Sequence, residues 1–546
     1  MKFKYYTVSA LATTLLSLTS CVGDLDVFPL NDKIISADKA YADAESYTKA
    51  LNKIYSVWAL SGQDGSLSSD ISGLDAGNTV MLRCWYTLQV NTTDEAKCAW
   101  SDSWVSSINE LTWNTSQVES VEGAYQRAMY IVALANEFMK NVYNAPSEIN
   151  KDRYAAEARF CRALAYYTLM DLFGRPPFIT EENYSLAPKQ ISREELFNWI
   201  EKELLEIRDS LPKKYEQYGR ADQNTVDALL ARMYLNAEVY TGKERYTDCI
   251  TRCNNVIAGG YELADNYAEL FMADNGENPN ANKEIIFPII ADGNNTRSYG
   301  IGAIILGSRS SSESSEATYG CVGGWDGFRS TGNLVRNFEF ASSDENQWNA
   351  DNIIDKRGIF YSNNRSIDII TNAQGTFTTE GWAVYKFTNL NSDGTPGKNA
   401  TFPDTDFPLF RLADIYLMYA EATARGGQGG DLATAVNYIN ALRDRGYGDT
   451  NHHIDQNWLT ESAKVGGTNT SVKFGNILNE RSRELYWEAT RRTDLIRYGL
   501  FTSSSYTWAE KGGIITGVGV DDKYKLFPIP ETDMSVNSNL TQNEGY

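Results

Sequence analysis

A dense run of charges near the carboxyl end places the strongest constraint on this chain. The stretch 479–499, NERSRELYWEATRRTDLIRYG, sets four acids among five arginines. Glu480, Glu484 and Glu488 recur every four residues, so on a helix they share one face, and Glu488 can reach the arginines three and four residues later. Carboxylates braced by arginines suit acid–base catalysis. They also suit a structural lattice of ion pairs on a half-buried helix, which we favour because such networks perturb pKa values without catalysing anything.

The bulk composition narrows the class of partner. A net charge of −21 over 546 residues argues against nucleic acid and anionic membrane surfaces, since both need a basic face. A neutral ligand fits better. The chain has only two histidines, His452 and His453, so histidine-based catalysis and histidine-rich metal sites are poorly supplied. The 33 tyrosines, 21 phenylalanines and 12 tryptophans either fill helix contacts or form a surface that stacks on ring-shaped ligands.

The amino-terminal segment indicates export and lipid attachment. Lys2 and Lys4 precede an apolar run over 8–18 that is too short to span a bilayer comfortably, so residues 1–20 are predicted to be a signal peptide. The run closes on Leu-Thr-Ser-Cys, which resembles the bacterial lipobox, with Cys21 as the lipidated residue. We therefore expect the mature chain, 21–546, to form a single domain held at a membrane by its lipid.

Four of the remaining cysteines form two suggestive pairs. Cys84 and Cys98 flank a short loop and could form a disulfide in an oxidising compartment. Cys249 and Cys253 lie one helical turn apart, which favours two buried thiols over a zinc site that would need four ligands.

Hydrophobic periodicity predicts a mainly α fold with an irregular half. The helical scaffold is expected at about 36–60, 118–257 and 407–500, with individual helices at about 118–142, 147–173, 192–211, 224–240, 246–257, 409–425, 431–443 and 472–492. Residues 62–116 show no helical period and are predicted to be a long ordered loop region. Residues 258–403 carry β-like runs (EIIFPII, GIGAIIL, GWAVYKF) among many glycines and asparagines. Long loops of this kind are usually functional.

Several stretches together resemble the SusD/RagB family of outer-membrane glycan-binding lipoproteins. They are the lipobox, RFCRALAYYTLMDLFGRPPF, GRADQNTVDALLARMYL, PDTDFPLFRLADIYLMYAEA, ERSRELYWEATRRTDLIR, and the terminal LFPIP and QNEGY. The resemblance implies about four tetratricopeptide-like helix pairs supporting an irregular ligand-binding half. It also implies a binding protein that is not an enzyme, and a partner: a SusC-like TonB-dependent barrel over which the lipoprotein sits as an extracellular lid.

Within this family the chain is similar to the starch-binding members, whose site is an aromatic arc with polar neighbours. The resemblance places the arc's rings on Trp100, Tyr299 and Trp325, its polar groups on Arg83 and Asp75, and Ser103 where the family's starch binders carry an asparagine. The chemistry agrees, because aromatic rings stack on the C–H face of a sugar while acids, arginines and hydroxyls bind its hydroxyl rim. Trp85 and Trp104 are expected to be structural anchors instead.

A calcium site is the second expectation. Oxygen ligands at two-residue spacing are typical of a calcium loop, and the resemblance suggests that such an ion lies between two segments. The candidate ligands are Asp274, Asn278, Asn280, Asp404 and Asp406. A solvated acidic loop is the alternative.

Two other functions remain open at this point. One is a receptor of the same family for a different ligand, such as a β-glycan, a host glycan or a peptide. The other is a glycoside hydrolase using a pair of acids, although no pair of carboxylates at strand ends supports it.

Overall fold

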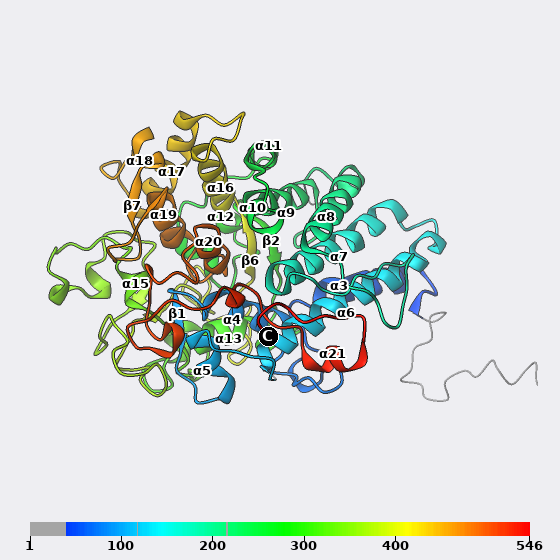
Figure 1. The fold of residues 1–546 in the computed structure, drawn as a ribbon, viewed down its shortest axis with the longest axis horizontal. Coiled ribbons are helices and arrows are strands. Elements are labelled where there is room, and N and C mark those ends of the chain that lie inside the picture. Colours follow the sequence, from blue (N-terminus) through cyan, green and yellow to red (C-terminus); the bar gives the residue numbers. More distant parts are fainter. Residues whose placement is uncertain (1–39, 117, 215–216) are drawn as a thin grey trace, which may run out of the picture.

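The computed structural model describes residues 40–116, 118–214 and 217–546. The predicted signal peptide and the lipidation site Cys21 lie outside these described residues. The fold is mainly α-helical with small sheets, as predicted, and most of the long helices lie along the top and right of the molecule in Figure 1. Within the described ranges, none of the helices combines the length and apolar character needed to cross a membrane.

Within the described residues, eight long helices build the scaffold. They are α3 (Ala44–Ser56), α6 (Glu119–Asn141), α7 (Lys151–Phe173), α8 (Arg193–Ile207), α9 (Gln223–Leu235), α11 (Tyr246–Ile257), α16 (Leu412–Ala424) and α17 (Leu432–Tyr447). Helix α6 packs on α7, α7 on α8, α9 on α11, α11 on α16 and α16 on α17. The starts follow from capping: Asn150, Ser192, Asp222 and Asp431 each accept a backbone N–H from the first turn of the helix that follows. This succession of packed neighbours confirms the predicted helical scaffold.

Shorter helices lie in the irregular half, between the long helices and in the carboxy-terminal part of the chain. They are α4 (Met81–Val90), α5 (Ser103–Glu110), α10 (Ala237–Thr241), α12 (Pro279–Asn282), α13 (Tyr299–Gly307), α14 (Glu316–Tyr319), α15 (Gly332–Val335), α18 (Gln456–Thr460), α19 (Gly475–Leu485), α20 (Arg491–Arg497) and α21 (Glu531–Val536). Two predictions were wrong here. The stretch 62–116 contains α4 and α5, and GIGAIIL, predicted to be β-like, lies in α13. Nearly all residues of α4 and α13 are buried, so neither helix shows an amphipathic period.

The sheets are small and antiparallel. One has the strand order β1 (Ala96–Cys98), β3 (Phe328–Ser330), β5 (Ala383–Val384), β4 (Phe360–Tyr361). A second pairs β2 (Ile285–Ile289) with β6 (Phe407–Arg411), and a third pairs β7 (Ser462–Lys464) with β8 (Ser471–Lys473). EIIFPII therefore forms a strand as predicted, whereas GWAVYKF contributes only the two residues of β5. Since β6 precedes α16, the helix predicted from residue 409 begins at 412.

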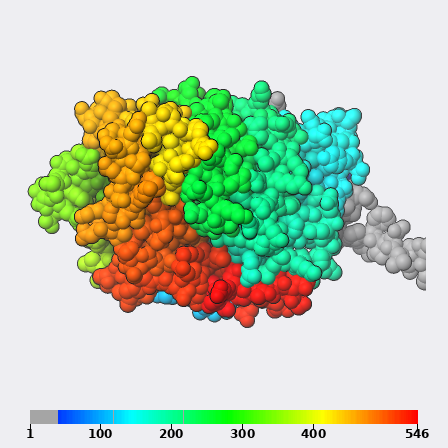
Figure 2. Space-filling view, turned by 45° about the horizontal axis from the view of Figure 1, so that its top comes forward, coloured from blue at the N-terminus to red at the C-terminus, as the bar shows by residue number. Residues whose placement is uncertain are grey.

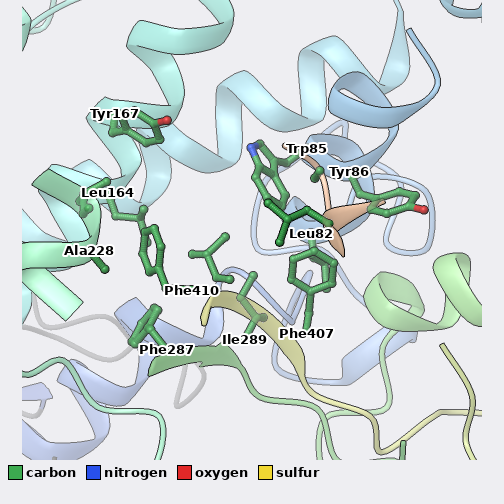
Figure 3. Close-up of a cluster of buried hydrophobic side chains, with 14 of the residues drawn as sticks. Leu82, Trp85, Tyr86, Leu164, Tyr167, Ala228, Phe287, Ile289, Phe407 and Phe410 are labelled. Carbon is green, nitrogen blue, oxygen red and sulfur yellow. The ribbon is translucent and has the colours of Figure 1, made fainter. Parts of the chain in front are cut away.

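The core lies where α4, α7 and the β2–β6 pair meet (Figure 3). Leu82, Trp85 and Tyr86 of α4 point toward Phe407 of β6, and the Trp85 and Phe407 ring centroids are 5.9 Å apart. A second layer of contact runs from Tyr86 to Phe328 of β3, at 6.0 Å between ring centroids. Burial of large aromatic side chains of this kind contributes about 1.5–3 kcal/mol each to folding. This core fixes α4, which in turn carries a residue of the candidate site.

The charged stretch 479–499 is not one helix. Helix α19 ends at Leu485, α20 begins at Arg491, and Trp487 and Ala489 between them adopt positive φ values of 64° and 59°, which an α-helix cannot contain. Glu488 lies in this break, and it accepts hydrogen bonds from Lys386 and Arg411. Its predicted pairing with the arginines three and four residues later was therefore wrong.

The acids of α19 belong to a buried ion-pair network whose partners come mostly from other elements. Glu480 binds Arg357, Arg443 and Arg483, and Glu484 binds Arg357, Arg411 and Arg445. Burial alone would raise the pKa of both carboxyl groups, but the surrounding guanidinium groups hold it well below the usual range. The ion-pair lattice that we predicted for these acids is confirmed, although it joins several elements and does not run along one helix.

All six cysteines in the described ranges are buried free thiols. Cys84 and Cys98 do not form the suggested disulfide: the Cys84 thiol donates to the Asn78 carbonyl oxygen, at 3.5 Å between sulfur and oxygen, and burial raises the pKa of both thiols to about 12. Cys249 and Cys253 are a buried pair of thiols, as predicted.

The outer surface is continuous over these parts. In Figure 2 the carboxy-terminal segments, yellow to red, lie directly against the green middle of the chain, and yellow-green loops project beside them at the left edge. The helices thus support the loop-rich half, which carries the candidate site.

Candidate functional site

Helix α13 organises the candidate site. Tyr299 begins it, after Ser298 caps the helix by accepting the Gly300 N–H. At its other end, the carbonyl oxygens of Leu306 and Gly307 accept the backbone N–H groups of Trp325 and Gly327 at 2.8 and 2.9 Å. Helix α13 packs on α4. One buried helix therefore positions two of the predicted aromatic rings.

Three predicted rings stand together as an arc. The ring centroid of Trp325 lies 5.6 Å from Tyr299 and 6.3 Å from Trp100. The Trp100 indole N–H donates to the Trp325 carbonyl oxygen at 2.6 Å, which fixes the ring's orientation. Beneath it, Phe328 packs at 5.0 Å between centroids and joins Trp100 to the core. All three rings of the arc are half-buried, so each keeps an accessible edge or face.

Glycines make room for these rings. A Cβ atom on Gly327 would lie 2.6–2.8 Å from three atoms of the Trp100 indole, and one on Gly77 would lie 3.2 Å from the Tyr299 ring. Cβ atoms in proteins essentially never approach other atoms as closely as the 2.6–2.8 Å found at Gly327. The position of Trp100 therefore depends on the absence of a side chain at residue 327.

Polar groups surround the arc in a hollow of about 380 Å³. Its lining comprises Gly77, Asn78, Arg83, Trp100, Asp102, Tyr299 and Trp325. The guanidinium carbon of Arg83 lies 5.4 Å from the Trp100 ring centroid and 5.8 Å from that of Trp325, a cation–π arrangement. Burial lowers the pKa of this guanidinium, and nearby acidic groups offset only part of that effect. The guanidinium nevertheless stays charged. Arg83 donates to the Gly77 carbonyl oxygen at 3.2 Å, which leaves other N–H groups for ligand.

The structure brings four of the six predicted site residues together around this hollow: Arg83, Trp100, Tyr299 and Trp325. Asp75 lies at its edge, where one carboxylate oxygen accepts the backbone N–H groups of Gly77 and Asn78 at 2.8 and 2.7 Å. Its observed contacts thus shape the turn before α4. Ser103 is exposed at the start of α5 and does not line the hollow.

Two lining residues escaped the sequence analysis, Asn78 and Asp102. Both are exposed and polar. Asp102 precedes α5 without capping it by a side-chain hydrogen bond, so its carboxylate is available to a ligand. The sequence could have indicated Asp102 through its position two residues after Trp100. Of the two tryptophans expected to be structural anchors, Trp85 is buried, as predicted. Trp104 is only half-buried, and its ring centroid lies 6.4 Å from that of Trp100.

The candidate calcium ligands do not converge. Asp274 binds Ser392, and the side-chain amides of Asn278 and Asn280 both donate to Glu269. The carboxylates of Asp404 and Asp406 accept backbone N–H groups instead. Across the described ranges, no cluster of three or more Asp, Glu, His or Cys side chains is arranged to hold a metal ion. These candidate donors are engaged by groups of the protein itself, and the calcium ion stays a prediction.

Comparison with known proteins defines the class. A model of the SusD family matches residues 227–546, and a second family model, described as "Starch-binding associating with outer membrane", matches residues 74–235. The chain belongs to the SusD family of glycan-binding proteins.

Individual proteins of this family resemble the chain in sequence or in structure. The starch-binding protein SusD of Bacteroides thetaiotaomicron is 33% identical over the full length of both chains. Among solved structures, a SusD superfamily protein from Parabacteroides distasonis (20% identity, TM-score 0.66) covers 92% of this chain and 99% of its own. The surface glycan-binding protein A of Bacteroides thetaiotaomicron, in complex with laminarihexaose, is 17% identical with a TM-score of 0.66 and covers the same shares. These structures share the fold, which confirms the predicted fold class.

Proposed function

We propose that this protein binds starch and maltooligosaccharides at the arc of Trp100, Trp325 and Tyr299. The observation that carries the proposal is geometric: three half-exposed rings and Arg83 face one hollow that also holds Asn78 and Asp102. Rings set at angles of 53° and 61° to one another present a curved apolar surface. A helical α-glucan offers a matching curve of C–H faces, and its hydroxyls can bind the polar groups. The full-length similarity to a starch-binding protein supports this choice of glycan.

The proposed role is capture, followed by delivery to a SusC-like TonB-dependent transporter in the outer membrane, with the protein held on the cell surface by a lipid on Cys21. The family resemblance supports this role, and so does the match to a family described as associating with the outer membrane. A Cys21→Ser variant should therefore no longer be recovered in the membrane fraction. Unaltered membrane retention would contradict the anchor.

Retention on a starch affinity gel tests the binding site. Trp100→Ala and Trp325→Ala should each weaken binding by about 2 kcal/mol or more, roughly 30-fold, as for central aromatic anchors in other interfaces. Both rings are half-exposed, so the melting temperature should stay within a few degrees. Tyr143→Ala is the matched control, because Tyr143 is 57% exposed and lies away from the hollow. Unchanged retention of both tryptophan variants would refute the site.

A β-glucan is the alternative ligand. The solved relative in complex with laminarihexaose shows that the fold is compatible with a β-glucan. Calorimetry with maltoheptaose and laminarihexaose separates the two: tighter binding of laminarihexaose would replace starch as the ligand. We propose that the protein has no catalytic activity, and incubation with maltooligosaccharides should therefore release no new reducing ends.

A further inference from the structure

A second hollow adjoins the proposed binding site and shares the tryptophan pair with it. Its volume is about 530 Å³, and it shares Trp100, Trp325 and Asp102 with the first hollow. The rest of its wall includes Ser101, Ser311, Ser312, Asp326, Phe377 and Thr378. The two hollows are therefore neighbouring parts of one surface.

Backbone hydrogen bonds fix the walls of the second hollow. The Ala99 N–H donates to the Gly327 carbonyl oxygen at 2.9 Å, and the Gly375 N–H donates to that of Ala99 at 3.0 Å. On the facing side, the Asp326 N–H donates to the carbonyl oxygen of Arg309 at 3.0 Å, while the Ser311 hydroxyl donates to the Asp326 carboxylate at 2.6 Å. Three chain segments are thus held together without a ligand, as in preformed binding sites.

The floor is also anchored. Phe377 is 3% exposed and packs with Ala99 and Ala383. The guanidinium carbon of Arg365 lies 5.3 Å from its ring centroid, and Arg365 is paired with Glu313. The hollow therefore has an apolar base held in place by its neighbours.

The lining chemistry selects the kind of ligand. Hydroxyl groups come from Ser101, Ser311, Ser312 and Thr378, carboxylates come from Asp102 and Asp326, and no lysine or arginine belongs to the described lining. Carboxylates accept hydrogen bonds from hydroxyl groups, and serine and threonine both donate and accept them. An anionic ligand would meet two negative charges here. The hollow fits a neutral polyhydroxylated chain.

We propose that this second hollow is an additional subsite for further glucose units of the same α-glucan chain. Because Trp100, Trp325 and Asp102 line both hollows, a chain stacked on these rings in the first hollow can continue into the second. The proposal rests on the proposed starch-binding function. It adds that affinity depends on chain length, because a longer chain fills both hollows.

Calorimetry with maltotriose, maltopentaose and maltoheptaose tests the subsite. In the unaltered protein the affinity should rise about tenfold or more from the shortest to the longest chain, which corresponds to about 1.4 kcal/mol. Ser312→Leu and Thr378→Leu place bulk in the second hollow without adding an aromatic ring or a charge. Each should keep the maltotriose affinity and reduce the gain from chain length to about threefold or less. Ser147→Leu, at an exposed serine away from the hollow, is the matched control.

The outcomes separate the two proposals. Loss of the length-dependent gain in at least one of the two variants, with maltotriose binding retained and the control unaffected, supports the subsite. A gain at least as large in both variants as in the unaltered protein overturns it, as does an affinity that is independent of chain length in the unaltered protein. Absence of binding for all three oligosaccharides would instead overturn the proposed function itself.

Discussion

Removing one buried carboxylate tests the role of the charged stretch 479–499. Both oxygens of Glu484 are engaged: Oε1 accepts hydrogen bonds from Arg411, at 2.6 Å, and Arg445, and Oε2 accepts one from Arg357, at 3.0 Å. The side chain of Glu484 is 0% exposed. A Glu484→Gln substitution keeps the shape but leaves three buried guanidinium groups short of one charge, and breaking a buried pair in this way costs about 3–5 kcal/mol. We expect the free energy of unfolding to fall by this amount.

The assay is chemical unfolding, with Glu45→Gln as the matched control. Glu45 pairs with Lys49 at 2.7 Å, but their side chains are 74% and 73% exposed, so losing this pair should change stability by about 0–1 kcal/mol. Binding of maltoheptaose under conditions where both variants are folded should be unaltered. A Glu484→Gln variant as stable as the control, or one that folds normally and loses glucan binding, would refute the structural role.

The pH dependence provides an internal check. The guanidinium groups lower the folded-state pKa of Glu484 below its ordinary value of 4.5, against the opposing effect of burial. Its stabilising contribution is therefore complete above pH 4.5 and is lost as the pH falls below that value. The stability difference between Glu484→Gln and the unaltered protein should narrow as the medium is acidified.

Three further predictions concern the site, a buried acid and calcium. Gly327→Ala should push the Trp100 ring aside and weaken retention on starch. Gly302→Ala is the control, because its Cβ would lie 3.6 Å from its nearest neighbours, an ordinary contact. Equal retention of the two variants would contradict the packing argument. Burial raises the pKa of Glu95 from 4.5 to about 8, so its stabilising contribution is complete below pH 4.5 and is lost as the pH rises through 8. Glu95→Gln should therefore raise the melting temperature at pH about 9 and change it little at pH about 5; equal shifts at both values would be inconsistent with this. The calcium prediction is tested with a chelator: a clear drop in the melting temperature that added calcium reverses would show that the ion binds, and an unchanged melting temperature would count against it.

The long amphipathic helices could be predicted from sequence because their periodicity and caps act locally. Helix α11 begins and ends at the predicted residues 246 and 257. Helices α4 and α13 could not, because 9 of the 10 residues of α4 and all but the first of α13 are buried, and an all-round apolar segment has no face to reveal. A short apolar run with Gly and Ile fits a strand equally well. Tertiary packing decided between the two.

The candidate site was predictable to the extent that the family resemblance marks its rings. Trp100, Tyr299 and Trp325 are separated by up to 225 residues, and only the fold shows that they share one hollow. The differences from the predicted set are local: Asp75 turns its carboxylate to the backbone of its own loop, and Asp102, not Ser103, lines the hollow. Loop residues carry no periodic signal that tells which side chain faces a ligand and which one stabilises a turn.

The charged stretch and the glycan site are joined through one helix. The indole N–H of Trp487, in the break between α19 and α20, donates to the Ser308 hydroxyl at 3.2 Å. Ser308 directly follows α13, whose first residue is Tyr299 and whose last carbonyl groups hold Trp325. The ion pairs around Glu484 and Glu488 thus fix the backbone that presents Trp487, and Trp487 supports the far end of the helix that carries the arc. Because this support acts on the position of α13 and not on the ligand, a change there that leaves the protein folded should not alter the preference between glycans, while changes in the hollows should alter it.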